Sequence, residues 1–338
     1  MIVINYETNI TGSIKTSGYA YPFITEYTLR KTLPFLTYIN ILNYRITIEG
    51  DIIDIDDTAV IDMAISYGVA PILFLSTLSS QGVGSMEVTN AVLTDENVQN
   101  HLFDNLIRII ESKGFYGINI YLQYINEFNT PLYESLIKRL SEQLKRRELL
   151  LFVTITPQIN IERTEIDYPN INYSIIGSYA DSVILVSYDW AYSYGPPEAA
   201  TPLNIIQSIV ESVTNIILKD KVLLGIQVIG YDWELPYIPT YTLGRSITFD
   251  LAIALALNTG SSIQYDEISQ DPYFFYINEN GRLHLVWFQD ARSVNSMTQL
   301  VMEKNLQGLS IWNLMRFFNQ MWLIINYQFE IEKIDLKR

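Results

Sequence analysis

Short apolar runs recur along the chain between longer segments with helical periodicity, and this alternation limits the folds open to it. Continuous apolar runs that end in polar or aromatic residues are typical of parallel strands buried on both faces. Eight such strands, with helices between them, favour a closed (β/α)₈ TIM barrel over an open sheet. The predicted strands are Ile2–Tyr6, Leu36–Tyr44, Ala70–Ser76, Gly117–Gln123, Leu150–Thr156, Ser182–Tyr188, Lys221–Ile229 and Gly308–Asn313. The predicted helices include Thr58–Tyr67, Glu96–Ser112, Pro131–Arg147 and Leu203–Leu218.

The interval between the seventh and eighth predicted strands is too long for one crossover helix. Its middle part, Ser262–Asp290, is predicted to form an antiparallel hairpin that turns at residues 278–281, Asn-Glu-Asn-Gly. Barrels of this size fold as one unit. We therefore predict a single barrel domain over residues 1–338, with a small α+β insertion over residues 231–306.

Charge and composition exclude several classes of function. The formal net charge of −15 opposes binding to phosphate backbones and anionic lipid heads, so we expect neither nucleic acid nor a membrane as a partner. The chain has no cysteine and two histidines, so we expect no metal site and no cofactor. Residues 1–6 lack a basic region that leads into an apolar segment. We therefore expect synthesis in the cytoplasm without a signal peptide.

The carboxyl ends of the strands are where a barrel of this kind builds its active site. In the fourth predicted strand, alternation places Asn119, Tyr121 and Gln123 on one face, which we expect to be the barrel interior.

Aromatic residues mark three further strand ends. Three tryptophans delivered to one face are hard to explain by core packing alone, because loops would have to cover each of them. At the sixth strand, an Asp that caps the next segment beside a packed Trp is an equally good interpretation. The residues concerned are Tyr188, Asp189, Trp190, Tyr231, Trp233 and Trp312.

Taken together, these segments resemble the spore-germination branch of glycoside hydrolase family 18, which includes N-acetylglucosaminidases that act on spore-cortex peptidoglycan. The resemblance covers essentially the whole chain, from residues 36–38 to residues 319–322. Its most specific parts are Ser-Tyr-Asp-Trp at 187–190 with Gly-Pro-Pro at 195–197, and Gly-Tyr-Asp-Trp-Glu-Leu-Pro-Tyr at 230–237. Residues 263–266, 286–293 and 311–314 continue it in order. The resemblance implies the same barrel fold.

The family's fourth-strand signature has an Asp and the catalytic Glu where this chain has Tyr121 and Gln123. In the mechanism that the resemblance implies, the Glu protonates the glycosidic oxygen, while the substrate's acetamido oxygen attacks under the guidance of the Asp. Gln123 has no transferable proton, and a general acid alone is worth about 10²–10⁴ in rate. We therefore expect a catalytically inactive, chitinase-like pseudoenzyme with no catalytic residues.

Three functions stay open at this stage. A structural or self-assembling protein of a spore coat or another spore layer is favoured, because Tyr121 would occlude the position of the acetamido group. A weak residual glycosidase would use Asp189 or Glu127 as a replacement acid. A lectin-like protein would bind glycans that contain N-acetylglucosamine, such as peptidoglycan or chitin. Its binding residues would be Asn119, Tyr188, Asp189, Trp190, Tyr231, Trp233 and Trp312.

Overall fold

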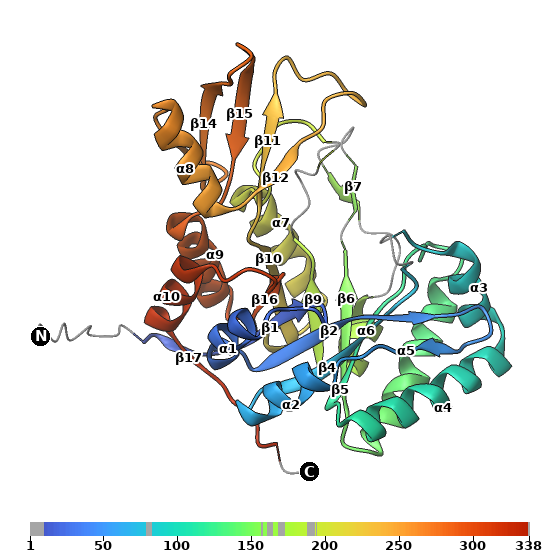
Figure 1. Ribbon diagram of the computed structural model, residues 1–338. Coiled ribbons are helices and arrows are strands. Elements are labelled where there is room, and N and C mark those ends of the chain that lie inside the picture. Colours follow the sequence, from blue (N-terminus) through green and yellow to red (C-terminus); the bar gives the residue numbers. More distant parts are fainter. Residues whose placement is uncertain are drawn as a thin grey trace, which may run out of the picture.

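The computed structural model describes residues 10–78, 83–156, 158–160, 165–167, 173–187, 193 and 195–336. Eight parallel strands lie in the order β1-β16-β10-β9-β6-β5-β4-β2, and the pairing of β2 with β1 closes the ring (Figure 1). The predicted (β/α)₈ barrel is therefore confirmed. The barrel strands are β1 Gly12–Ala20, β2 Tyr38–Ile46, β4 Ala70–Ser76, β5 Gly117–Tyr121, β6 Leu150–Ile155, β9 Ser182–Leu185, β10 Val222–Gln227 and β16 Gly308–Trp312.

Short strands extend this architecture at its edges. β3 (Ile52–Ile53) pairs antiparallel with β2, and β17 (Phe329–Ile331) pairs parallel with β1. β7 (Gln158–Asn160) and β8 (Glu165–Asp167) form a separate antiparallel pair after β6.

The first barrel strand differs from the prediction. The predicted strand Ile2–Tyr6 lies outside the described residues, and β1, Gly12–Ala20, occupies the place between β16 and β2. β1 has few apolar residues because Ser17 and Tyr19 take part in a polar cluster, in which Ser17 accepts a hydrogen bond from Asn40. The other seven predicted strands overlap the observed ones.

Helices form the outer layer. In α4, the carboxylate of Asp95 accepts hydrogen bonds from two backbone N–H groups of the first turn, and Gly114, with φ +78°, ends the helix. Its buried residues Leu102, Leu106 and Ile110 recur every four positions and face the strands. The helices are α1 Glu26–Thr32, α2 Thr58–Ser66, α3 Met86–Thr94, α4 Glu96–Lys113, α5 Thr130–Lys145, α6 Tyr173–Tyr179, α7 Leu203–Thr214, α8 Phe249–Thr259, α9 Ala291–Lys304 and α10 Asn319–Gln328. Short 3₁₀ turns lie at Leu33–Phe35 and Lys219–Lys221.

The core has two apolar layers. The larger layer lies between the strands and the surrounding helices, and the second, which includes Phe152, Ile184 and Leu223, fills the barrel itself. The barrel interior is therefore a packed core. A ligand site is expected at the mouth of the barrel, where the carboxyl ends of the strands lie.

A second, antiparallel sheet stands beyond the carboxyl ends of the barrel strands (Figure 1). Its strands lie in the order β12-β11-β15-β14-β13, and α8 covers one face. The predicted hairpin is confirmed as β14 and β15, which are joined through Asn278 and through Gly281, with φ +74°. The predicted limits of the insertion, 231–306, stay a prediction. The strands are β11 Gly230–Glu234, β12 Arg245–Ile247, β13 Gln264–Asp266, β14 Asp271–Ile277 and β15 Leu283–Trp287.

Among the described residues, the helices are all too short or too polar to cross a bilayer.

Candidate functional site

A polar cluster fills the barrel just below its mouth. Asn119 on β5 is fully buried, and its amide nitrogen donates to Tyr19 Oη at 3.2 Å and to Asn40 Oδ1 at 3.0 Å. Thr154 Oγ1 on β6 donates to Asn119 Oδ1 at 2.8 Å. Burial raises the pKa of Tyr19 to about 12, so this phenol stays neutral at physiological pH. Asn119 therefore faces the interior, as predicted, but lies beneath the surface that a ligand would touch.

A cavity of about 350 Å³ opens above this cluster at the ends of β5 and β6. This volume falls at the small end of the range of ligand-binding pockets. Tyr121 lines it, with its hydroxyl 3.3 Å from Thr156 Oγ1 and its ring 6.3 Å from the ring of Phe74. The ten lining residues include no carboxylate: they are Tyr121, Leu122, Gln123, Tyr124, Ile125, Tyr133, Thr154, Ile155, Thr156 and Tyr173.

Gln123 also lines this cavity and is half-buried. Its backbone N–H donates to Thr77 Oγ1 at 3.4 Å. The end of its side chain lies so close to Gly84 that a Cβ on Gly84 would come within 1.8 Å of Gln123 Oε1. Because Gly84 has no side chain, the amide of Gln123 has room to lie against it.

An aromatic row runs through the upper part of the barrel core from β5 to β16. Tyr121 contacts Phe74 on β4, Phe74 contacts Tyr19 on β1 with 5.5 Å between ring centroids, and Tyr19 contacts Trp312 on β16 with 5.2 Å. The last two contacts are edge-to-face, the arrangement that aromatic pairs prefer. Trp312 is half-buried. Phe74 and Tyr19 are buried in the barrel, so only the two ends of the row, Tyr121 and Trp312, are partly exposed.

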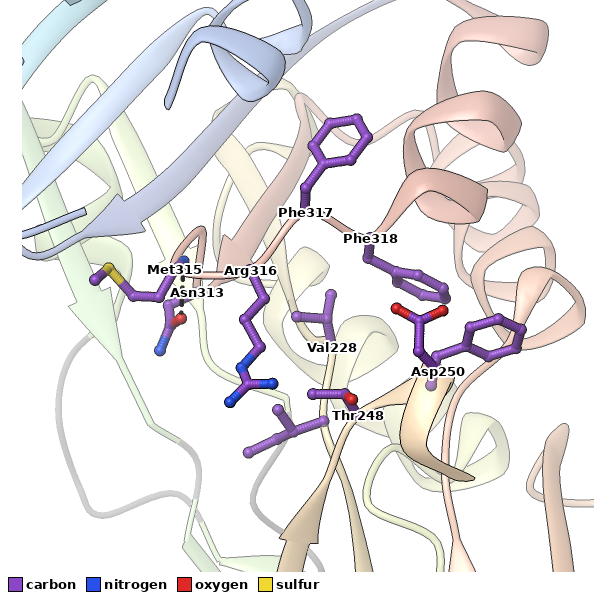
Figure 2. Close-up of a pocket in the computed structure, with 10 residues that line it drawn as sticks. Val228, Thr248, Asp250, Asn313, Met315, Arg316, Phe317 and Phe318 are labelled. Atoms are coloured by element: carbon purple, nitrogen blue, oxygen red, sulfur yellow. Dashed lines mark hydrogen bonds between the residues drawn. The ribbon is translucent and has the colours of Figure 1, made fainter. Parts of the chain in front are cut away.

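A second cavity, of about 300 Å³, lies on the other side of the mouth, at the ends of β10 and β16. Figure 2 shows the lining residues, which come from three segments distant in sequence. Asn313 Oδ1 accepts a hydrogen bond from the backbone N–H of Met315 at 3.1 Å, which fixes the start of the loop after β16. The lining residues are Val228, Ile229, Thr248, Phe249, Asp250, Asn313, Met315, Arg316, Phe317 and Phe318.

The remaining predicted site residues have different positions. Tyr188, Asp189 and Trp190 lie outside the described residues. Tyr231 and Trp233 lie on β11 of the second sheet, and both are buried. Trp233 Nε1 donates to Gly195 O at 3.1 Å, so it anchors the loop after β9. Their part in glycan binding stays a prediction.

Sequence reasoning missed Phe74, Thr154 and Arg316. Phe74 lies inside an apolar strand whose pattern does not distinguish its two faces. Thr154 is a polar residue directly after an apolar run within a predicted strand, and this position could have indicated a place near the barrel mouth. Arg316 lies on a loop, where no periodic pattern applies.

Comparison with known protein families shows to which family this chain belongs. The model of glycosyl hydrolases family 18 matches residues 87–316. The chain belongs to this family. The chain is similar to the Cortical fragment-lytic enzyme of Bacillus subtilis strain 168, to which it is 29% identical over 304 residues that cover 90% of this chain and 70% of that protein.

Solved structures give the same relationship. The spore cortex-lytic enzyme SleL of Bacillus cereus is 26% identical, with a TM-score of 0.89 over 95% of this chain and 75% of that one. SleL of Bacillus megaterium QM B1551 is 28% identical, with a TM-score of 0.89 over 96% of this chain and 76% of that one. The predicted resemblance to the spore branch of the family is therefore confirmed.

The prediction of an inactive, structural family 18 member is wrong by this comparison. The three relatives described above, each of which matches nine tenths of the chain or more, are named as lytic enzymes, which points to an enzyme. The prediction gave decisive weight to two positions of one strand, Tyr121 and Gln123, over the alternative that another acid, Asp189 or Glu127, replaces them. The equivalence of these two positions with the family's acids stays a prediction.

Proposed function

We propose that this chain is a glycosidase that acts on N-acetylglucosamine-containing glycan of the peptidoglycan type in a bacterial spore. The observation that carries this proposal is the match over nine tenths of the chain to enzymes named as cortex-lytic. A spore location and a glycan partner follow from the same relationship. Self-association and protein partners form no part of this proposal.

The barrel mouth has a form that suits a glycan chain. Sugar rings have apolar faces that stack on aromatic side chains, and an indole offers the largest such surface. The two partly exposed ends of the aromatic row are available for such stacking: Tyr121 lines the first cavity, and Trp312 precedes Asn313, which lines the second. We assign Trp312 as the stacking platform, since it is half-buried and rests on the fully buried Tyr19.

Glycoside hydrolysis needs a proton donor at the leaving oxygen. The described residues that line the first cavity include no carboxylate, so we look for the donor on the loops at the same face. Three acids lie on the loops after β5 and β9: Glu127, Asp189 and Glu198.

Glu198 is the candidate with the electrostatic property that a general acid requires. Burial raises the pKa of its carboxyl above the ordinary value, which is the direction of shift that suits a general acid. Its loop follows β9, which pairs with β6, and the end of β6 lines the first cavity. Glu198 is exposed on its loop, so solvent can exchange its proton.

The test is the release of new reducing ends from purified spore-cortex fragments by the wild-type protein. Heat-denatured protein at the same concentration gives the background. The proposal predicts reducing ends that increase linearly with time and with protein concentration. Release at the background level, from material that a known lytic enzyme degrades, would exclude this function.

A further inference from the structure

Arg316 extends into the second cavity from the loop after β16. Figure 2 shows its guanidinium pointing toward Thr248, while the carboxylate of Asp250 points to the other side, toward Phe318. All three segments that form this cavity meet at the carboxyl ends of β10 and β16. The guanidinium therefore lies on the same face of the barrel as Trp312.

This guanidinium has no partner in the described part of the chain. No described residue accepts a hydrogen bond from Arg316 or lies within ion-pair distance of it. This holds also for Asp250, although it lines the same cavity. By contrast, Arg282 and Arg292 each pair with a carboxylate. An unpaired guanidinium beside a cavity keeps its planar set of donors available for a ligand.

The surroundings of Arg316 combine two further donors, the Thr248 hydroxyl and the Asn313 amide, with apolar walls, and the carboxylate of Asp250 in the same lining points away from the guanidinium. The Oδ1 atom of Asn313 is occupied by the backbone of Met315, so the amide nitrogen of Asn313 is the part of that side chain left to donate. Val228, Ile229 and Phe249 supply apolar lining. A cavity with cationic and amide donors against apolar walls suits an anionic group carried on a partly apolar body.

We propose that Arg316, assisted by Asn313, binds the carboxylate of an acidic sugar in the glycan. A guanidinium matches a carboxylate in a planar, two-bond geometry. The net charge of −15 would otherwise repel such a sugar, so a local cation is required for it to bind. This inference rests on the proposed function, because it specifies which sugar of the glycan occupies this side of the mouth.

Binding of two matched disaccharides tests the inference. The probes are N-acetylglucosamine linked to N-acetylmuramic acid with a free carboxylate, and the methyl ester of the same disaccharide. Isothermal titration of the full chain should give about tenfold tighter binding for the free acid, because a charge-assisted pair outweighs a neutral one by about this factor. Arg316→Gln should abolish this preference, with about a tenfold loss of affinity for the free acid and a much smaller loss for the ester.

Two further variants separate the effect of the planar, two-bond geometry of the guanidinium from the effect of its positive charge. Arg316→Lys keeps the charge but loses the two-bond geometry, so it should retain part of the preference. Arg146→Gln removes a positive charge at the C-terminal end of α5 and should leave the preference intact.

The outcomes distinguish this inference from the proposed function. Equal affinity of the wild type for acid and ester, with cleavage of neutral N-acetylglucosamine oligomers, would overturn the carboxylate subsite alone. An equal loss of affinity for both probes in Arg316→Gln would also overturn it, since the residue would then act on the fold. No binding of either probe and no cleavage would overturn both proposals.

Discussion

The indole ring of Trp312 meets the phenol ring of Tyr19 edge to face, with 5.2 Å between their centroids. Tyr19 is buried and is itself held by Asn119, so the indole rests on a rigid support while part of it faces the mouth. Support of this kind reduces the entropy that a stacking residue loses when a ligand binds.

Replacement of Trp312 tests its role as the stacking platform. Trp312→Ala should lower kcat/KM on glycan by about 30-fold or more, since removal of a central aromatic contact costs about 2 kcal/mol. Trp322→Phe is the control, because Trp322 is buried on α10 against Phe35 and should affect thermal stability rather than KM. Unchanged kinetics in a folded Trp312→Ala protein would remove Trp312 from the site.

Asn119 should act on stability more than on ligand contact. Asn119→Ala removes three hydrogen bonds and leaves Asn40 Oδ1 without its donor inside the barrel, while Thr154 keeps only its contact with Tyr19. We expect the free energy of unfolding to fall by about 2–4 kcal/mol in urea titrations. Asn215→Ala, at the exposed end of α7, should change it by about 0.5 kcal/mol or less. Equal values for the two variants would contradict the importance of the cluster.

Asp271 should make stability depend on pH. It is fully buried where β14 begins, and burial raises its pKa to about 7. Since the folded-state pKa exceeds the unfolded value of about 3.9, the stabilising contribution is complete below pH 4 and is lost as pH rises to about 7.

The variant Asp271→Asn stays neutral at all pH values. The wild type should therefore lose roughly 2–4 kcal/mol of unfolding free energy between pH 4 and pH 7 relative to Asp271→Asn. Denaturant titrations of both proteins across this range measure the difference. Parallel pH profiles would show that Asp271 does not titrate in the folded state.

Glu198 should determine the basic limb of the pH–rate profile. A general acid works only when protonated, so kcat/KM should fall as pH rises through the raised pKa of Glu198. Glu198→Gln should lower the rate by about 10²–10⁴ and remove that limb. Glu142→Gln, exposed on α5, is the control. If Asp189→Asn or Glu127→Gln lowers the rate and removes the basic limb instead, that residue is the proton donor.

Strands with strong apolar character could be located from the sequence. β4 was predicted at both of its ends because all seven residues, Ala70–Ser76, are buried and six of them are apolar or proline. β1 was missed because its contribution to the barrel is polar, through Ser17 and Tyr19, and because Gly18 leaves room for Leu314, 2.6 Å from where its Cβ would be. A pattern of apolar residues in the sequence does not predict contacts of this kind.

The two halves of the site differ in how far the sequence reveals them. Tyr121, Gln123 and Trp312 were found because each lies at or just beyond the end of a barrel strand, and strand ends converge in a barrel. Thr248 and Arg316 are 68 positions apart, as their residue numbers show, and meet only because β12, α8 and the loop after β16 pack together. Their proximity depends on tertiary structure alone.

The most direct test of the account is mass spectrometry of the products that wild-type protein forms from defined N-acetylglucosamine oligomers and cortex fragments, run beside Tyr121→Asp/Gln123→Glu. The account predicts shorter glycans from the wild type itself, with each new reducing end carrying one added water. An inert wild type beside an active double variant would contradict it, because the mouth would then accept glycan but lack a working acid.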